Sequence, residues 1–172
     1  VVFEEVTNGA RGNAALTDLA AELHDTHNLD YQVFLSDLIG QGLIPEAIAF
    51  MYNPTVLKPE ILPGTTRLVQ NIEIPGRDLV RTQWEAGDFD FTLIAGHLAW
   101  SNKADQDAGY DKINEIFSTD TPSQFSDDPD IIVLGDFNRF GLDYDSVKRL
   151  QYDPQRFLAP NITIFDPQFS QL

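Results

Sequence analysis

Hydrophobic and polar residues alternate most regularly between residues 89 and 98, and this pattern predicts a β-strand with one apolar face. That face consists of Phe89, Phe91, Leu93, Ala95 and His97. His97 therefore stands at the far end of a hydrophobic strand face. A single histidine in such a place is usually hydrogen-bonded within the core, although a functional imidazole would occupy the same position.

Shorter segments rich in β-branched and aromatic residues predict further strands at residues 1–6, 29–35, 47–52 and 79–84, and near 162–165. Residues 56–76 contain three prolines and two glycines, so they predict loops with one edge strand around 67–74. Tyr52 ends one of these strands, and we interpret it as a packing residue rather than a catalytic one.

Apolar residues at helical spacing predict amphipathic helices at residues 13–23 and 102–117, and a short helix at 143–150. Asn13 is the expected N-cap of the first helix. His24 and His27 follow that helix, and cationic residues commonly end helices, so we interpret them as terminal residues rather than metal ligands. Helices with one apolar side cover a sheet, so the chain is predicted to be a layered α/β protein.

Candidate functional residues follow the apolar segment Ile131–Leu134, which runs directly into Gly135, Asp136, Phe137 and Asn138. A short apolar run without polar alternation is typical of a strand buried on both faces. If the chain stays extended, Asp136 and Asn138 point to one face and Phe137 points into the core as an anchor. Gly135 would leave room for a close ligand or a bend. The alternative is an ordinary polar turn after a strand.

Composition limits what this chain can be. Its 172 residues suffice for one domain, and 42% of them are hydrophobic, which excludes global disorder. No apolar run approaches the ~20 residues that a membrane span needs. There is no cysteine, so disulfides and thiol chemistry are excluded. The chain begins within a predicted strand and shows no targeting segment, so we expect a fragment.

The net charge of -16 comes from 19 Asp and 8 Glu against 4 Lys and 7 Arg. Such a surface repels nucleic acid at low salt, so binding a phosphodiester would need local cations, a metal ion or a high ionic strength. Abundant aspartate with scarce lysine favours a salt-adapted protein or an extracellular or periplasmic one, although many ordinary acidic enzymes share this balance.

The string Gly135-Asp136-Phe137-Asn138 after a hydrophobic strand resembles the signature of the endonuclease/exonuclease/phosphatase superfamily, the DNase I-like metal-dependent phosphoesterases. Three other matches occur in the expected order. They are Glu5, in Glu4-Glu5-Val6 where the family usually has Gln-Glu-Val; Arg81, in the strand before the histidine strand; and His97, in Gly96-His97-Leu98. The resemblance implies a four-layer αββα sandwich of two packed, mainly antiparallel sheets with helices outside.

The resemblance also implies a function and a role for each matched residue. Glu5 would bind Mg²⁺, or Mn²⁺ or Ca²⁺ in its place, through hard carboxylate oxygens. Asp136 would orient or deprotonate the attacking water as a catalytic residue, together with Asn138 and His97. Arg81, His97 and Asn138 would bind the substrate phosphate. The resemblance implies a metal-dependent phosphoesterase, and the first expectation is an endonuclease-type enzyme that hydrolyses phosphodiester bonds.

Two parts of the family pattern are missing from the sequence. No histidine follows His97, so the C-terminal Ser-Asp-His motif is absent, and the first strand with its active-site asparagine is absent too. We therefore expect residues 1–172 to be a single domain of this type, truncated at both ends. The alternative is a non-catalytic acidic module on the same scaffold that binds cations or a basic partner. The sequence leaves open whether the phosphoester is in DNA, RNA, a lipid headgroup or an inositol phosphate.

Overall fold

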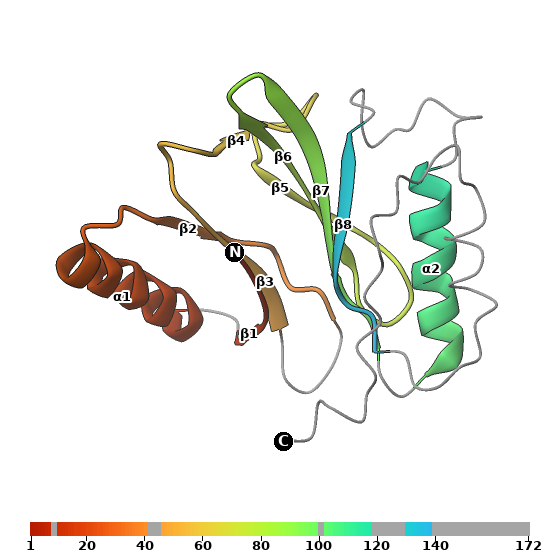
Figure 1. The fold of residues 1–172 in the computed structure, drawn as a ribbon. Helices are drawn as coiled ribbons and strands as arrows, with labels where there is room; N and C mark the ends of the chain where they lie inside the picture. The colour runs from red at the N-terminus through yellow and green to blue at the C-terminus, as the bar shows by residue number, and fades with distance from the viewer. Residues whose placement is uncertain (8–9, 41–45, 100–101, 118–129, 139–172) are drawn as a thin grey trace, which may run out of the picture.

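The computed structural model describes residues 1–7, 10–40, 46–99, 102–117 and 130–138, which form two β-sheets and two long helices (Figure 1). The helix expected at 143–150 and the strand expected near 162–165 lie outside the described residues. Among the helices of the described ranges, none is long and apolar enough to cross a membrane.

The first sheet is antiparallel and consists, in spatial order, of β1 (Val2–Thr7), β3 (Glu46–Tyr52) and β2 (Gln32–Leu35). Helix α1 (Ala10–His27) covers its outer face. Leu16 of the helix packs against Ala49 and Met51 of β3, with Leu23 also in contact. The helix therefore buries the apolar side that its sequence spacing predicts.

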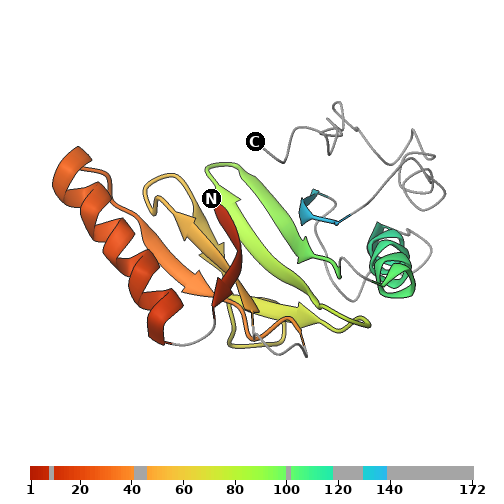
Figure 2. The ribbon, with the colours of Figure 1, turned by 90° about the horizontal axis from the view of Figure 1, so that it is seen from below.

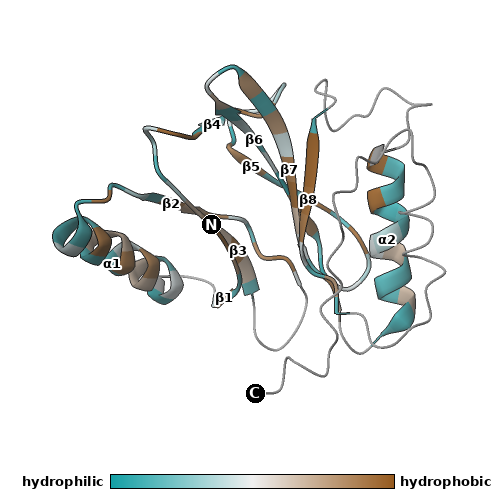
Figure 3. Ribbon diagram, in the orientation of Figure 1, coloured by the Kyte–Doolittle hydropathy of each residue, from teal (hydrophilic) through white to brown (hydrophobic). Residues whose placement is uncertain are grey.

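The second sheet has the spatial order β4 (Lys58–Glu60), β6 (Leu79–Ala86), β7 (Phe89–His97) and β8 (Ile131–Asp136), and β5 (Val69–Ile72) also pairs with β6. All of these pairings are antiparallel except that of β7 with β8, which is parallel. Helix α2 (Lys103–Phe117) covers the outer face, where Tyr110 and Ile113 pack against Leu79 and Ile94. Figure 3 colours most of β8 as hydrophobic, but among the described residues none of β8 is fully buried and Ile132 is 40% exposed, so the expectation of a strand buried on both faces is not met.

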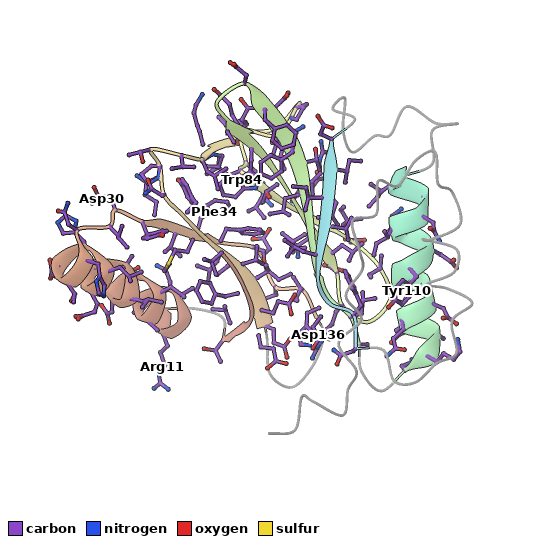
Figure 4. All side chains as sticks on the ribbon, in the orientation of Figure 1. Arg11, Asp30, Phe34, Trp84, Tyr110 and Asp136 are labelled. Carbon is purple, nitrogen blue, oxygen red and sulfur yellow. The ribbon has the colours of Figure 1, made fainter. Side chains whose placement is uncertain are left out.

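The main core lies between the two sheets. It is rich in aromatic residues, among them Phe34 and Trp84, which Figure 4 labels. Phe34 stacks on Phe50 at 5.1 Å between ring centroids, and Tyr52 meets Trp84 edge to face, also at 5.1 Å. Such pairs add about 0.5–1.5 kcal/mol beyond the area they bury. Tyr52 is thus a packing residue, as interpreted from the sequence.

The layers follow the order α1, first sheet, second sheet, α2, which Figure 2 shows from below. This is the αββα sandwich that the sequence resemblance implies, and both sheets are mainly antiparallel, as expected. The fold class is therefore confirmed.

Some local expectations are wrong. Helix α1 begins at Ala10, so Asn13 lies inside the helix and is not its N-cap. β1 continues to Thr7, one residue beyond the end predicted from the sequence. The sequence predicts a loop where β4 lies, because Pro59 disfavours a central strand. Pro59 is tolerated because β4 is an edge strand of the sheet.

Candidate active site

A β-bulge in β1 turns two consecutive glutamates toward the second sheet. The register of β1 against β3 shifts between Phe3 and Val6, so Glu4 and Glu5 together oppose a single residue of β3. Side chains of a regular strand alternate between faces, whereas a bulge re-aims them. The positive φ of Glu5, 55°, belongs to this irregularity. Both glutamates consequently reach groups of the second sheet.

His97 is held between two carboxylates of the first sheet. It ends β7 on the face that meets the first sheet, and its side chain is only 3% exposed. Its Nδ1 lies 3.2 Å from Oε2 of Glu46, and its Nε2 lies 3.4 Å from Oε1 of Glu5. Glu46 is largely buried, at 16% exposure, while Glu5 is 70% exposed. One side of the imidazole is therefore fixed in the interior and the other faces an accessible carboxylate.

Arg77, just before β6, joins Glu46 and His97. Its Nη2 donates to Oε1 of Glu46 at 2.9 Å, and its Nη1 lies 2.9 Å from Nδ1 and 2.8 Å from Nε2 of His97. With its proton on Nδ1, the imidazole donates to Glu46, and its Nε2 accepts from Nη1 of Arg77. The three side chains form a network of partners that orient one another.

Strand β8 places Asp136 beside His97. The two residues are register partners in the parallel pairing of β7 and β8, so both point to the face that meets the first sheet. Figure 4 shows Asp136 at the end of β8. Phe137 instead packs near Tyr110 under α2, with 6.1 Å between ring centroids, and so anchors the strand end in the core. This is the anchor expected from the sequence.

Glu4 crosses from the first sheet to the backbone of β8. Its Oε1 and Oε2 lie 2.9 and 3.1 Å from the backbone nitrogen of Asp136, which donates to them. Burial raises the pKa of the Glu4 carboxyl above its usual value, an effect that the hydrogen bond from Asp136 and the charge of His97 oppose. Glu4 is thus partly desolvated next to two other acids of the site.

Asn138 is fixed by contacts on three sides. Its backbone N–H donates to Oδ1 of Asp136 at 2.8 Å, and its backbone carbonyl accepts from Nε2 of Gln106 at 2.7 Å. Its side-chain Nδ2 donates to the backbone carbonyl of Leu98 at 2.8 Å. Its φ is 48°, a left-handed conformation that asparagine tolerates. Asn138 therefore does not continue the extended alternation expected from the sequence, but it still lies beside Asp136.

The structure brings together Glu5, His97, Asp136 and Asn138, but it does not bring Arg81 to them. Arg81 pairs with Ile94, so its side chain projects from the face of the second sheet that α2 covers. His97 belongs to the opposite face of the same sheet. Arg81 is 4% exposed. Its expected phosphate contact therefore has no support in this geometry, and Arg77 is the arginine that lies at the site.

Sequence reasoning missed Arg77 and Glu46, although the hairpin contained a signal for the arginine. The turn at residues 87–88 makes Ala86 and Phe89 partners, and counting outward along both strands pairs residue 79 with residue 96. His97 is then level with the residues just before β6, where Arg77 stands, and not with Arg81. Glu46 had no such signal, because its approach to His97 depends on how the two sheets pack.

The donor set fits a hard divalent cation at Glu5. Within the described ranges, no group of three or more His, Cys, Asp or Glu side chains converges on one point that could hold a metal ion. Mg²⁺ does not require such a cage, since it commonly binds one or two carboxylates, several waters and substrate oxygens. Glu5 has an exposed carboxylate beside His97, and Asp136 is exposed as well. Oxygen ligands of this kind suit Mg²⁺, Mn²⁺ or Ca²⁺.

No model of a known protein family matches the sequence, and neither does any curated protein. The fold does match solved structures. A form of D. rerio TDP2 humanised by 14 mutations has a TM-score of 0.52 and 18% identity, over 86% of this chain and 55% of that one. D. rerio TDP2 complexed with a single strand DNA product has a TM-score of 0.51 and 16% identity, over 88% and 50% of the two chains.

The chain thus spans about half the length of the structures it matches. At these identities the likeness shows the fold alone. The roles of the site residues stay predictions, and they depend on the local geometry described above.

Proposed function

We propose that this chain, which has the DNase I-like fold of the endonuclease/exonuclease/phosphatase superfamily, is part of a divalent-metal-dependent phosphoesterase that hydrolyses phosphodiester bonds. The observation that supports this best is the setting of His97. A buried imidazole is held by Glu46 and Arg77 on one side and meets the exposed carboxylate of Glu5 on the other, next to Asp136. Such an arrangement of acids and donors suits a phosphate and its attacking water.

Each residue has a role that its contacts allow. Asp136 uses Oδ1 to accept from the backbone of Asn138, which leaves Oδ2 to orient a water and take its proton. Asn138 uses one amide N–H on Leu98, so the second can donate to a phosphate oxygen. The imidazolium form of His97, oriented by Glu46 through Nδ1, offers its Nε2–H as a further donor to the non-bridging oxygens.

Arg77 would bind the substrate phosphate, which is the role expected of Arg81 from the sequence. Its guanidinium has five donors in a planar fork, which suits a phosphate oxygen as well as the carboxylate of Glu46. Because Nη1 contacts His97, an arriving phosphate would meet the guanidinium and the imidazole together. The guanidinium, and the imidazole in its imidazolium form, then counter the charge of the substrate where the surrounding surface is acidic.

Glu5 is the residue that would hold the metal ion, with Asp136, the register partner of His97, as a second exposed carboxylate on the other sheet. When bound there, Mg²⁺ would neutralise phosphate charge and stabilise the leaving oxygen. The protein's own contribution is to fix the carboxylates: the bulge in β1 aims Glu5 at the site, and the parallel pairing with β7 holds Asp136. Preorganised groups of this kind usually supply the largest share of catalysis.

Single-stranded DNA is the first substrate to test, since a D. rerio TDP2 structure of the same fold contains a single strand DNA product. The net charge of -16 predicts weak binding of any polyanion at low ionic strength. We therefore expect activity on DNA to rise with added Mg²⁺ and with moderate salt. A small phosphodiester such as bis(p-nitrophenyl) phosphate should depend on Mg²⁺ but much less on salt.

The test is an assay of both substrates with the natural protein that contains this sequence, in Mg²⁺ and in EDTA, at low and high salt. We expect hydrolysis in Mg²⁺ only. Glu5→Gln should raise the Mg²⁺ concentration needed for half-maximal activity by about tenfold or more, since it removes a charged ligand. Metal binding without hydrolysis of either substrate would refute the enzyme and favour the non-catalytic acidic module.

A further inference from the structure

Glu4 is the one acid of the site that the proposed reaction leaves without a task. It comes from the first sheet, yet both its carboxylate oxygens lie within 3.1 Å of the backbone nitrogen of Asp136 in the second sheet. The two residues are 132 positions apart in the sequence. This hydrogen bond therefore joins the two sheets at the point where Asp136 leaves β8.

The residues around this bond leave space for it. Gly135 has a φ of 148°, and a Cβ added there would lie 2.9 Å from Oε1 of Glu4 and only 1.9 Å from the carbonyl oxygen of Gly96. Gly135 and Gly96 are also register partners in β8 and β7. The absence of a Cβ at Gly135 thus lets the Glu4 carboxylate approach the peptide between residues 135 and 136.

The bond fixes a short segment on which the proposed chemistry depends. The amide of Asp136 is tied to Glu4, and its carbonyl accepts from the N–H of Leu98 at 3.0 Å. Its side chain then accepts from the N–H of Asn138. With both backbone polar groups of Asp136 fixed, the carboxylate has little freedom to move away from His97 and Glu5.

We propose that Glu4 is a positioning residue, which holds the backbone of Asp136 and thereby sets the place of its carboxylate relative to His97 and Glu5. The proposal rests on the proposed function as far as activity is concerned. The role belongs to the acceptor oxygens and not to the negative charge. A glutamine at this position supplies one such oxygen, so Glu4→Gln should act like the wild type.

The direct test is hydrogen–deuterium exchange of the Asp136 amide, followed by NMR in the natural protein without metal. Glu4→Met fills a similar volume without an acceptor and should speed exchange of this amide by about tenfold or more, because an N–H that loses its partner is exposed to exchange. Glu4→Gln should stay within about threefold of the wild type. Glu60→Met, on exposed β4, is the matched control. Should Glu4→Met fail to fold, Glu4→Ser replaces it, since its hydroxyl is too short to reach.

Kinetics provide the second arm. Glu4→Met should lower kcat by about tenfold or more with KM within about threefold, and Glu4→Gln should restore kcat. Unchanged exchange in Glu4→Met overturns the proposal. So does a Glu4→Gln variant that loses activity while its Asp136 amide stays protected, because the charge would then be what matters. A wild type that hydrolyses nothing refutes the proposed function instead, and the exchange data still decide whether Glu4 holds Asp136.

Discussion

The Nδ1 atom of His97 lies 3.2 Å from Oε2 of Glu46, although the two residues are 51 positions apart and belong to different sheets. Glu46 opens β3 and His97 ends β7, so their contact depends on how the sheets pack face to face. It also makes Glu46 the partner that fixes the orientation of the imidazole. The site is therefore a product of the sandwich and not of one motif.

Replacing Glu46 should disable the site without touching the metal ligand. Glu46→Gln removes the charge that holds Nδ1 of His97, so we expect kcat to fall by about 100-fold. The Mg²⁺ concentration for half-maximal activity should change little, because Glu5 is intact. Steady-state kinetics measure both quantities, with Glu60→Gln as a control on an exposed strand. A wild-type kcat in Glu46→Gln would contradict the role of Glu46 in orienting His97.

Replacing Arg77 should affect catalysis, whereas replacing Arg81 should affect stability. Arg77→Met removes the donor beside His97 and should lower kcat/KM by about 100-fold. Arg81→Met acts on the face under α2, so it should change the free energy of unfolding while leaving kcat/KM within about threefold. Urea denaturation and kinetics on both variants check this. A larger kinetic defect in Arg81→Met than in Arg77→Met would restore the role first expected of Arg81.

Gly135 should tolerate no side chain. A Cβ there would lie 1.9 Å from the carbonyl oxygen of Gly96, which belongs to the neighbouring strand and cannot move cheaply. We expect Gly135→Ala to lower the free energy of unfolding by about 3 kcal/mol. Gly64→Ala is the matched control, since its φ of 71° is also positive but nothing lies within 4 Å of the added atom. It should cost only about 1 kcal/mol. Equal costs in urea denaturation would contradict the close approach of β7 and β8.

Tyr52 gives a prediction about pH. Burial raises the pKa of its phenol above 10.0, so the folded state favours the neutral form. The stability that this contributes is fully present below pH 10 and is lost as pH rises through the folded pKa. Tyr52→Phe lacks the hydrogen bond to Gln32, measured at 2.6 Å, and should be less stable at pH 7 by about 1 kcal/mol. Urea denaturation should show this gap closing above pH 10; a gap that widens would contradict the assignment.

Much of the fold could be predicted because its strands are local patterns. The alternation from Phe89 to His97 and the apolar run before Gly135 correspond to β7 and β8, and the resemblance supplied the layer order. The start of α1 was misplaced because Asn13 is a good N-cap by type, while the helix gains another turn before it. Propensity alone does not fix such boundaries.

The site could be predicted only where a residue lies within a motif. The family resemblance names Glu5, His97, Asp136 and Asn138 within its motifs, and the structure brings them together. Glu46 and Arg77 belong to no motif, and their position depends on sheet packing and hairpin register. The bulge at Glu4 and Glu5 was not foreseen either, because strict alternation would have sent these two side chains to opposite faces.

The central claim is that Asp136 acts chemically at a metal-assisted phosphoester site. It is tested most directly by Mg²⁺-dependent hydrolysis of bis(p-nitrophenyl) phosphate by the natural protein and its Asp136→Asn variant, with Asp90→Asn as the control at another exposed strand position. We predict that Asp136→Asn lowers kcat by about 1,000-fold or more, with a change in the free energy of unfolding below about 1 kcal/mol, while Asp90→Asn behaves as the wild type. An Asp136→Asn protein that hydrolyses the substrate at the wild-type rate would contradict the claim.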